Sequence, residues 1–296
     1  MAVSTIPKTR FRFIKKYGMA YLFIAVPILS MIVFLFIPMV ISFIWSLNDF
    51  SGLTAAKFVG LQNYIRLFTA DPIFIKSLVN TTLFVLMGMG IGPTLGMLTA
   101  LMLNQNVKFR AIFRTAYYLP VMTSMVVVST IWIMLYNQNG LINSVLNVFG
   151  LGNVGWLSDP RISLVSVAIA AIWQGFGFET VVFLAAMQSI PHELYEAATM
   201  DGAGNFQKFW YITLPLLKPV ILFVYIIGII GSYQVFDEVF VMTAGGPVYS
   251  TTSIVLYLYN KFMDLRLGYA SAIAYILFAI LVVFSFIQWR FFGERT

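Results

Sequence analysis

Residues 189–219 read SIPHELYEAATMDGAGNFQKFWYITLPLLKP and form a polar segment between two long apolar blocks. Pro191 suits the first turn of a helix, and the helix dipole favours the carboxylate of Glu193 in that turn. Gly202 indicates where this helix ends, and Asn205 is placed to cap a second one. The pattern therefore predicts a helix, a glycine turn and a second amphipathic helix, all outside the lipid.

Long apolar blocks make up most of the remaining chain. Its composition, with 60% hydrophobic and 10% charged residues, excludes an ordinary soluble protein. A helix needs about 20 apolar residues to cross a bilayer. Six blocks meet that length: residues 21–45, 77–103, 115–136, 163–188, 216–242 and 269–289. Because lipid requires a fully paired backbone, and because the blocks are too continuous for barrel strands, we predict an all-α polytopic membrane protein with six transmembrane helices.

The net charge of +7 follows the loops between these blocks and forms no basic stripe. Counted along the chain, twelve basic residues fall on one side: Lys8, Arg10, Arg12, Lys15, Lys16, Lys108, Arg110, Arg114, Lys208, Lys218, Arg290 and Arg295. The other six, Lys57, Arg66, Lys76, Arg161, Lys261 and Arg266, fall on the opposite side. The positive-inside rule then predicts that both termini are cytoplasmic. The positive charge is therefore explained by orientation in a lipid membrane, and no nucleic-acid partner is needed to account for it.

The residue types present exclude several kinds of chemistry. The chain has no cysteine, which excludes disulfides and thiolate sites, and its one histidine, His192, cannot form a histidine cluster. It contains no G-x-x-x-x-G-K-[ST] phosphate loop, so we do not expect it to bind ATP. No polar cluster of catalytic type is visible either. We expect a chain that is not an enzyme and that holds no cofactor or metal of its own.

The apolar blocks divide the chain into an N-terminal part, residues 1–76, and a five-helix core, residues 77–296. The N-terminal part contains a basic leader, the first transmembrane helix and an outer loop. The glycines of the second block, between residues 88 and 96, permit close helix packing or a hinge.

Local patterns predict further features of the spans and loops. Pro27 and Pro38 each remove a helix hydrogen bond, so the first span is expected to bend. Residues 58–68, FVGLQNYIRLF, have apolar side chains at helical spacing and predict a short interfacial helix, and residues 141–149 contain a second amphipathic fragment. Residues 243–247, TAGGP, predict a turn that ends the fifth block.

The polar segment 189–219 also has the features of a docking element. It combines small residues, which allow a partner close to the backbone, with acidic residues that can pair with basic groups. The residue pattern alone leaves two readings open, a surface loop packed on its own bundle and a helix docked on a cytoplasmic protein.

The spacing within this segment resembles a known motif. Glu196-Ala197-Ala198 is followed by Gly202 and, after nine intervening residues, by I-x-L-P at residues 212–215, as in the EAA motif of the membrane subunits of binding-protein-dependent ABC importers. The extended form, E-A-A-x-x-D-G-A with I-x-L-P-L-x-x-P, resembles the carbohydrate-uptake branch, above all the maltose-transporter type. Residues 27–50, 58–64 and 245–247 are similar to that branch as well.

This resemblance implies the type I permease fold of ABC importers in a bacterial or archaeal cytoplasmic membrane. It implies a pair formed with a second homologous permease, two copies of a cytoplasmic ATPase that hold ATP and Mg, and an extracytoplasmic solute-binding protein. The residues implied to couple this chain to the ATPase are Glu193, Glu196, Ala197, Ala198, Asp201, Gly202 and Ala203.

Polar side chains within the spans are candidates for a substrate pathway, because they are costly in lipid. They lie in WQGFGFE, residues 173–179, and in GSYQVFDE, residues 231–238. Amides, hydroxyls, carboxylates and aromatic faces are the groups that bind sugars. The polar candidates are Gln174, Glu179, Ser232, Tyr233, Gln234 and Asp237, and the resemblance to maltose-transporter-type permeases also implies Gly175 and Phe178 at the sugar site. For Glu179 the sequence leaves open a structural hydrogen bond between helices and a role near the pathway.

The expected function is the ATP-driven uptake of a sugar or oligosaccharide by alternating access. The same machinery carrying a glycerol-phosphate or polyol is an open alternative. A self-sufficient secondary carrier or channel is a different class, and it would predict an inverted repeat, ion-coupling groups within the membrane and no EAA segment.

Overall fold

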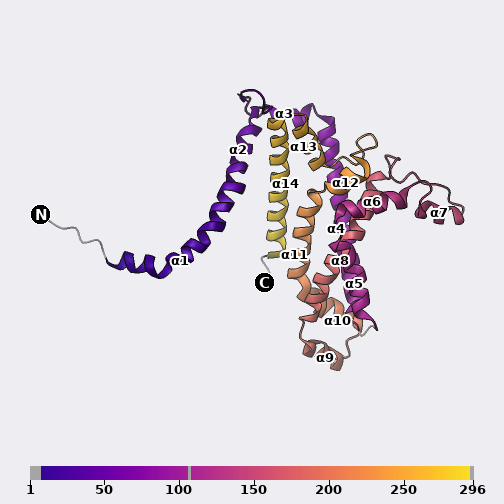
Figure 1. Cartoon of the computed structure of the whole chain (residues 1–296). Coiled ribbons are helices and arrows are strands. Elements are labelled where there is room, and N and C mark those ends of the chain that lie inside the picture. The colour runs from indigo at the N-terminus through magenta and orange to yellow at the C-terminus, as the bar shows by residue number, and fades with distance from the viewer. Residues whose placement is uncertain (1–7, 106–107, 294–296) are drawn as a thin grey trace.

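The computed structural model describes residues 8–105 and 108–293, and Figure 1 shows that helices dominate them. The α-helices are α1 (Lys8–Met31), α2 (Ile37–Ser46), α3 (Gln62–Thr69), α4 (Pro72–Leu103), α5 (Arg110–Met122), α6 (Met125–Tyr136), α7 (Leu141–Val148), α8 (Ser163–Gln188), α9 (His192–Met200), α10 (Asn205–Lys208), α11 (Leu214–Tyr233), α12 (Asp237–Thr243), α13 (Ile254–Met263) and α14 (Leu267–Gly293). Two π-helical turns, η1 (Ile32–Phe36) and η2 (Phe209–Thr213), and two short strands, β1 (Asn48–Asp49) and β2 (Lys57–Phe58), complete the elements. Six stretches are long and apolar enough to cross a membrane, which confirms the predicted number of spans.

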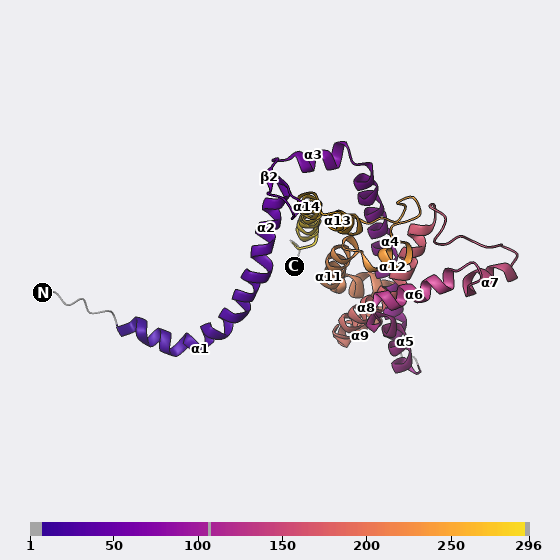
Figure 2. The same ribbon diagram turned by 45° about the horizontal axis from the view of Figure 1, so that its top comes forward.

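The first span is a bent helix whose N-terminal part, α1, extends away from the other helices, as Figures 1 and 2 show. It runs through α1, η1 and α2, and η1 lies between Pro27 and Pro38, so the predicted bend is confirmed. Its C-terminal part contacts α14, where Tyr275 donates a hydrogen bond to the carbonyl of Met39 and its ring lies 5.0 Å from that of Phe43. No residue in the most apolar 18-residue window of this span is buried. The basic leader predicted before it lies partly outside the described residues, which begin at residue 8.

The centre of the bundle is the contact between α4 and α8. Glycines allow this approach: a Cβ at Gly96 would lie 2.7 Å from the Cβ of Glu179, and a Cβ at Gly92 would lie 3.0 Å from its Oε2. On the other side of α8, a Cβ at Gly177 would lie 2.1 Å from the carbonyl oxygen of Tyr117 in α5. Close packing therefore explains Gly92 and Gly96, and α4 continues as one helix through Pro93.

Two of the predicted blocks are divided in the structure. The third is split into α5 and α6 by extended backbone at Thr123 and Ser124, after Pro120 has removed a hydrogen bond from the last turn of α5. The fifth ends as α11 at Tyr233, and α12 follows as a separate short helix. The boundary placed after residue 76 falls within α4, which begins at Pro72.

Short helices and loops gather at one end of the bundle, the upper end in Figure 1. The predicted helix within residues 58–68 is present as α3, and the fragment at residues 141–149 forms α7. The predicted turn follows α12, where Gly245 has a φ of +87° that favours glycine.

Asp71 joins three helices at this end. Its carboxylate caps α4 by accepting from the backbone N–H of Phe74 at 3.0 Å, and it accepts from the hydroxyls of Tyr257 in α13 and Tyr269 in α14 at 2.5 and 2.7 Å. Burial raises the pKa of Asp71, but these hydrogen bonds and the nearby Lys261 charge outweigh burial and lower the pKa below its usual value. The cap therefore fixes α13 and α14 to the start of α4.

Candidate functional site

The predicted polar segment lies at the opposite end of the bundle from α3, as Figure 1 shows. It consists of α9, α10 and η2, and it leads directly into α11. The backbone N–H of Ala203 donates to the carbonyl of Ala198 at 2.8 Å, and that of Gly202 donates to the carbonyl of Thr199 at 3.0 Å. This is the Schellman pattern, with Gly202 at a φ of +80°, so the predicted glycine stop is confirmed. The second helix is capped at Gly204 and not at the predicted Asn205.

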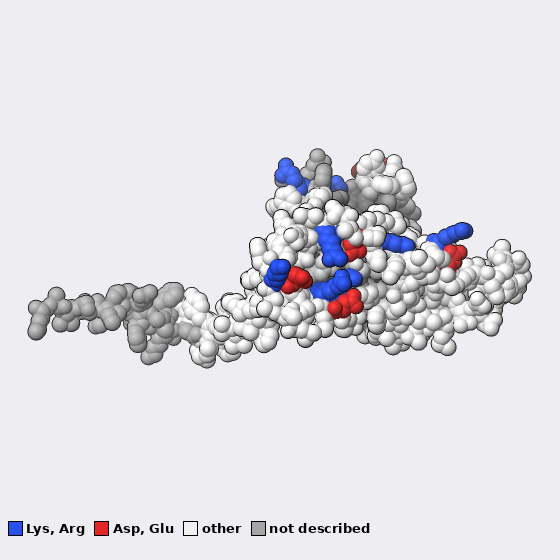
Figure 3. Space-filling model, turned by 90° about the horizontal axis from the view of Figure 1, so that it is seen from above, with Lys and Arg blue, Asp and Glu red and all other residues white. Residues whose placement is uncertain are grey.

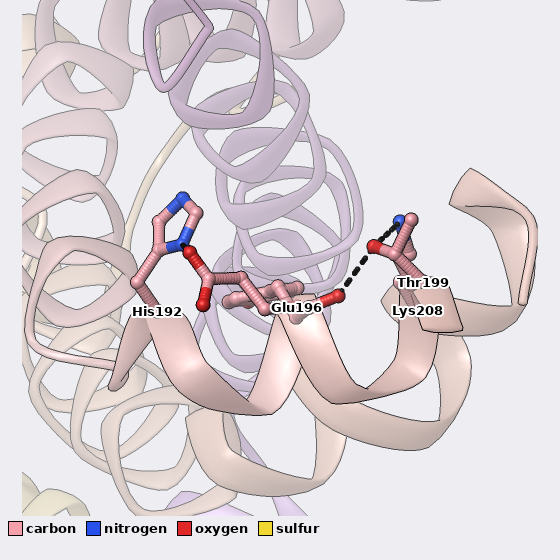
Figure 4. A network of polar contacts seen from close by, with 5 residues as sticks. His192, Glu196, Thr199 and Lys208 are labelled. Carbon is pink, nitrogen blue, oxygen red and sulfur yellow. Dashed lines mark hydrogen bonds and ion pairs between the residues drawn. The ribbon is translucent and has the colours of Figure 1, made fainter. Parts of the chain in front are cut away.

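Side-chain hydrogen bonds tie α9 to the segment that follows it. The hydroxyls of Tyr195 and Thr213 lie 2.8 Å apart, and Lys208 Nζ donates to Thr199 Oγ1 at 2.8 Å (Figure 4). On the same helix His192 Nδ1 lies 3.1 Å from Glu196 Oε1, in an exposed pair. These contacts hold α9 against α10 and η2 as one unit.

The outer face of this unit is exposed and mixed in character. Of the predicted coupling residues, Glu193, Glu196, Ala197, Asp201 and Gly202 are exposed, and Ala198 and Ala203 are half-buried. Large apolar side chains lie exposed among them, with Met200 84% and Phe206 75% exposed. No residue of α9 or α10 is buried. A surface with acidic groups, small residues and uncovered apolar side chains suits docking on another protein.

A second candidate site is a cavity of about 310 Å³ within the bundle. Residues from α4, α5, α8, α11 and α12 line it. The predicted pathway residues that line it are Gln174, Gly175, Phe178, Glu179 and Ser232. A Cβ added at Gly175 or at Gly231 would meet no atom within 4 Å, so the backbone of α8 and of α11 faces open space there.

Three predicted pathway residues do not line this cavity. Ser232 faces it, but Tyr233 is one position further along the helix, about 100° around the axis. Tyr233 is buried in a different core, with its ring centroid 5.5 Å from that of Phe284. Gln234 and Asp237 follow the end of α11 and are exposed.

Glu238, which belongs to the predicted polar stretch 231–238 but was not named as a site residue, also lines the cavity. It reaches the cavity because the chain breaks after Tyr233 and returns as α12, which packs on α6 and α8. The sequence feature that could have identified Glu238 is its position next to Asp237, in the acidic pair that begins α12. The lining residues of α4 include Gly88 and Gly92, which the sequence predicted only to permit close packing or a hinge.

A third site is an outer pocket of about 330 Å³ at the α3 end of the bundle. Arg66, Arg266, Asp49, Gln62, Asn63 and Tyr269 are among its lining residues. The guanidinium of Arg66 lies 6.0 Å from the ring centroid of Tyr269. Within the described residues neither arginine forms an ion pair. Figure 3, which views the molecule from this end, shows charges of both signs across the face.

Comparisons with known proteins agree with this geometry. Residues 92–292 match the family model described as "Binding-protein-dependent transport system inner membrane component". The lactose transport system permease protein LacF of Rhizobium radiobacter is 36% identical over 283 residues, which cover 93% of this chain and 94% of LacF. The trehalose/maltose transport system permease protein MalF of Thermococcus litoralis is 35% identical over 271 residues, covering 91% and 92% of the two chains.

Solved structures show the same fold. A chain in the crystal structure of a bacterial ABC transporter involved in the import of the acidic polysaccharide alginate matches with a TM-score of 0.86 at 25% identity, covering 98% of this chain and all of that one. A chain of the bacterial alginate ABC transporter in complex with an alginate pentasaccharide-bound periplasmic protein matches with a TM-score of 0.84 at 26% identity, covering 94% and 95%. The present chain belongs to the family of binding-protein-dependent transport system inner membrane components, and it is a multi-pass membrane permease.

Proposed function

We propose that this chain is one of two homologous membrane subunits of an ATP-driven importer of a sugar or oligosaccharide. An extracytoplasmic binding protein delivers the substrate, and two copies of a separate cytoplasmic ATPase hold and hydrolyse ATP with Mg. Both termini and α9 lie on the cytoplasmic side, and the chain passes substrate by alternating access without being an enzyme. The names of its relatives, which transport lactose, trehalose or maltose, and arabinooligosaccharides, support a carbohydrate.

The observation that best supports ATPase coupling is the exposed unit of α9, α10 and η2. Its outer face has no cover in the described chain, while its inner contacts connect it to α11. Because α11 also lines the cavity, a displacement of α9 by an ATPase would reach the substrate pathway through one continuous helix.

The first span supports a second membrane subunit. No residue of its most apolar window is buried, and α1 extends away from the bundle. A homologous permease on this face would cover that surface by helix packing, which between membrane helices depends on close van der Waals contact.

The outer pocket supports delivery by a binding protein. Two arginines, one aspartate and two amides line a polar recess at the end of the bundle opposite α9. Such mixed polar and charged groups are typical of transient protein interfaces, where complementary charge sets the orientation and rate of association.

The test uses the chain co-expressed with its neighbouring transport genes and purified as a complex. We expect a second permease and an ATPase to co-purify, and sugar uptake in proteoliposomes to require ATP and the binding protein. Glu196→Lys reverses an exposed charge on α9 and should reduce ATPase retention while the permease pair stays inserted. Glu193→Gln removes a charge in the first turn of α9 without reversing it, so it should reduce ATPase retention less than Glu196→Lys does. Normal uptake and normal ATPase retention in Glu196→Lys would contradict the assignment.

A further inference from the structure

The cavity between α4, α8, α11 and α12 is lined by acidic side chains and not by basic ones. Two carboxylates line it, Glu179 from α8 and Glu238 from α12. Its other polar side chains are the amide of Gln174 and the hydroxyl of Ser232. No lysine, arginine or histidine is among its described lining residues. The two glutamates are therefore the only ionisable side chains among the described lining residues.

Glu179 is held in this position by the packing of α4 against α8. Its side chain lies against Gly92 and Gly96, where any larger residue would collide with it. It is only 9% exposed, and its buried Oε2 has no hydrogen-bond partner among the described residues. A buried polar oxygen without a donor is costly, and more so within a membrane. Glu179 also lines the cavity, so its carboxyl group is among those that a ligand there would meet.

An anionic ligand would not find the groups that it needs in this cavity. A carboxylate, phosphate or sulfate that leaves water needs a cation or several donors around it. This cavity offers one amide and one hydroxyl beside two acidic groups. A neutral sugar has hydroxyls that donate to the carboxylates and oxygens that accept from Gln174 and Ser232.

We infer that this cavity selects uncharged sugars and rejects sugars that carry carboxylate, phosphate or sulfate groups. The inference rests on the proposed function and names the substrate class of the same pathway. It sets this chain apart from the alginate importer of similar fold, whose substrate is an acidic polysaccharide. It also disfavours the alternative in which the chain carries a glycerol-phosphate.

The test is equilibrium binding of labelled trisaccharides to the complete complex of both permeases and the ATPase in nanodiscs. Omitting the binding protein removes its own selectivity from the result. Two pairs matched in linkage differ only in charge: trimannose with trimannuronate, and trigalactose with trigalacturonate. We expect the neutral member of at least one pair to bind about tenfold or more tightly than its acidic counterpart, because like charges near a low-dielectric cavity repel.

Variants connect the preference to the two carboxylates. Glu179→Gln with Glu238→Gln keeps both shapes and should reduce the neutral-to-acidic binding ratio by about tenfold. Gln174→Lys adds a cation to the lining and should shift the ratio in the same direction, which keeps the test valid if the double variant fails to assemble. Asp237→Asn removes a neighbouring exposed carboxylate outside the cavity, and it should leave the ratio unchanged.

Equal binding of the neutral and acidic members in the unmodified complex would overturn the inference and leave sugar import standing. A ratio that stays unchanged in correctly assembled Glu179→Gln/Glu238→Gln and Gln174→Lys complexes would also overturn it. If no sugar of either charge binds while the complex takes up a glycerol-phosphate, both the inference and the proposed carbohydrate function fail.

Discussion

The hydroxyl oxygens of Tyr195 and Thr213 lie 2.8 Å apart, and their hydrogen bond joins α9 to the π-helical turn that continues into α11. The bond crosses the glycine turn, so it holds the two sides of the turn at a fixed distance. A displacement of α9 can therefore be transmitted to α11 and does not only bend the turn at Gly202.

Tyr195→Phe removes this bond and leaves the ring in place. A net hydrogen bond is worth about 1 kcal/mol, so we expect the substrate transported per ATP hydrolysed to fall by about fivefold. Paired uptake and phosphate-release measurements in proteoliposomes give this ratio. Tyr211→Phe removes an 80% exposed hydroxyl from the same turn and is the matched control. An unchanged ratio in Tyr195→Phe would show that coupling does not depend on this bond.

Gly202→Ala tests the helix stop. The φ of +80° at Gly202 costs an L-residue about 1–2 kcal/mol, so alanine should loosen the end of α9 and reduce ATPase retention during purification. Gly204→Ala is the control, because Gly204 has a φ of −72° and a Cβ there would meet only Gln207 Oε1, at 3.9 Å. Equal retention in the two variants would exclude a role for the left-handed backbone at Gly202.

Larger side chains at Gly175 and Gly177 should affect different properties, sugar binding at Gly175 and stability at Gly177. Gly175→Trp extends into open space of the cavity and should abolish sugar binding with little change in thermal stability. Gly177→Ala forces a Cβ to within 2.1 Å of the Tyr117 carbonyl oxygen, and overpacking of this kind costs about 1–3 kcal/mol. Fluorescence-detected size-exclusion chromatography after heating measures stability, and labelled-sugar binding measures the pathway. Sugar binding retained in Gly175→Trp would place the pathway elsewhere.

Asp71 should make stability depend on pH. Its pKa is lowered in the folded protein, so its contribution is complete above the unfolded-state value of about 3.9 and is lost as the pH falls through the lower folded value. Asp71→Ala removes the cap of α4 and should cost about 0.5–2 kcal/mol near neutral pH. The gap between the melting temperatures of the two proteins should then narrow as the pH falls below 4.

Asp264→Asn is the control for the Asp71 experiment. It removes an ion pair in which Asp264 lies 3.6 Å from Lys261 and is 57% exposed, and exposed pairs contribute little. If the difference in melting temperature between Asp71→Ala and the unmodified protein stays constant with pH, the charge of Asp71 contributes nothing to stability beyond its packing.

Local patterns were sufficient to predict much of this fold. Length and hydropathy gave the six spans, proline positions gave the bend in the first one, and the pattern around Gly202 gave α9 and its end. Each of these depends on residues near one another in the chain. The predicted coupling roles of the α9 residues remain predictions, as does the absence of a cofactor from this chain.

Long-range contacts decided what the sequence did not reveal. The break after Tyr233 is supported by Ser253, whose hydroxyl donates to the Val235 carbonyl at 2.8 Å from 18 positions away. That break brings Glu238 to the cavity and turns Gln234 and Asp237 away from it. The rotation of α11, which separates Ser232 from Tyr233, likewise depends on neighbouring helices. Hydropathy, by which the span looks continuous, contains no signal for either the break or the rotation.

The fit of Glu179 between Gly92 and Gly96 limits how the bundle can change shape. If α8 rolled sideways on α4, the bulk of Glu179 would leave the row of small residues at Gly88, Gly92, Gly96 and Ala100 and meet the larger side chains beside it. The two helices are therefore locked against rolling over one another and must turn together as a pair. The shear that opens and closes the pathway then belongs to the contacts around that pair, so a disulfide linking α4 to α8 should leave turnover intact, whereas one linking α11 to α4 should arrest it.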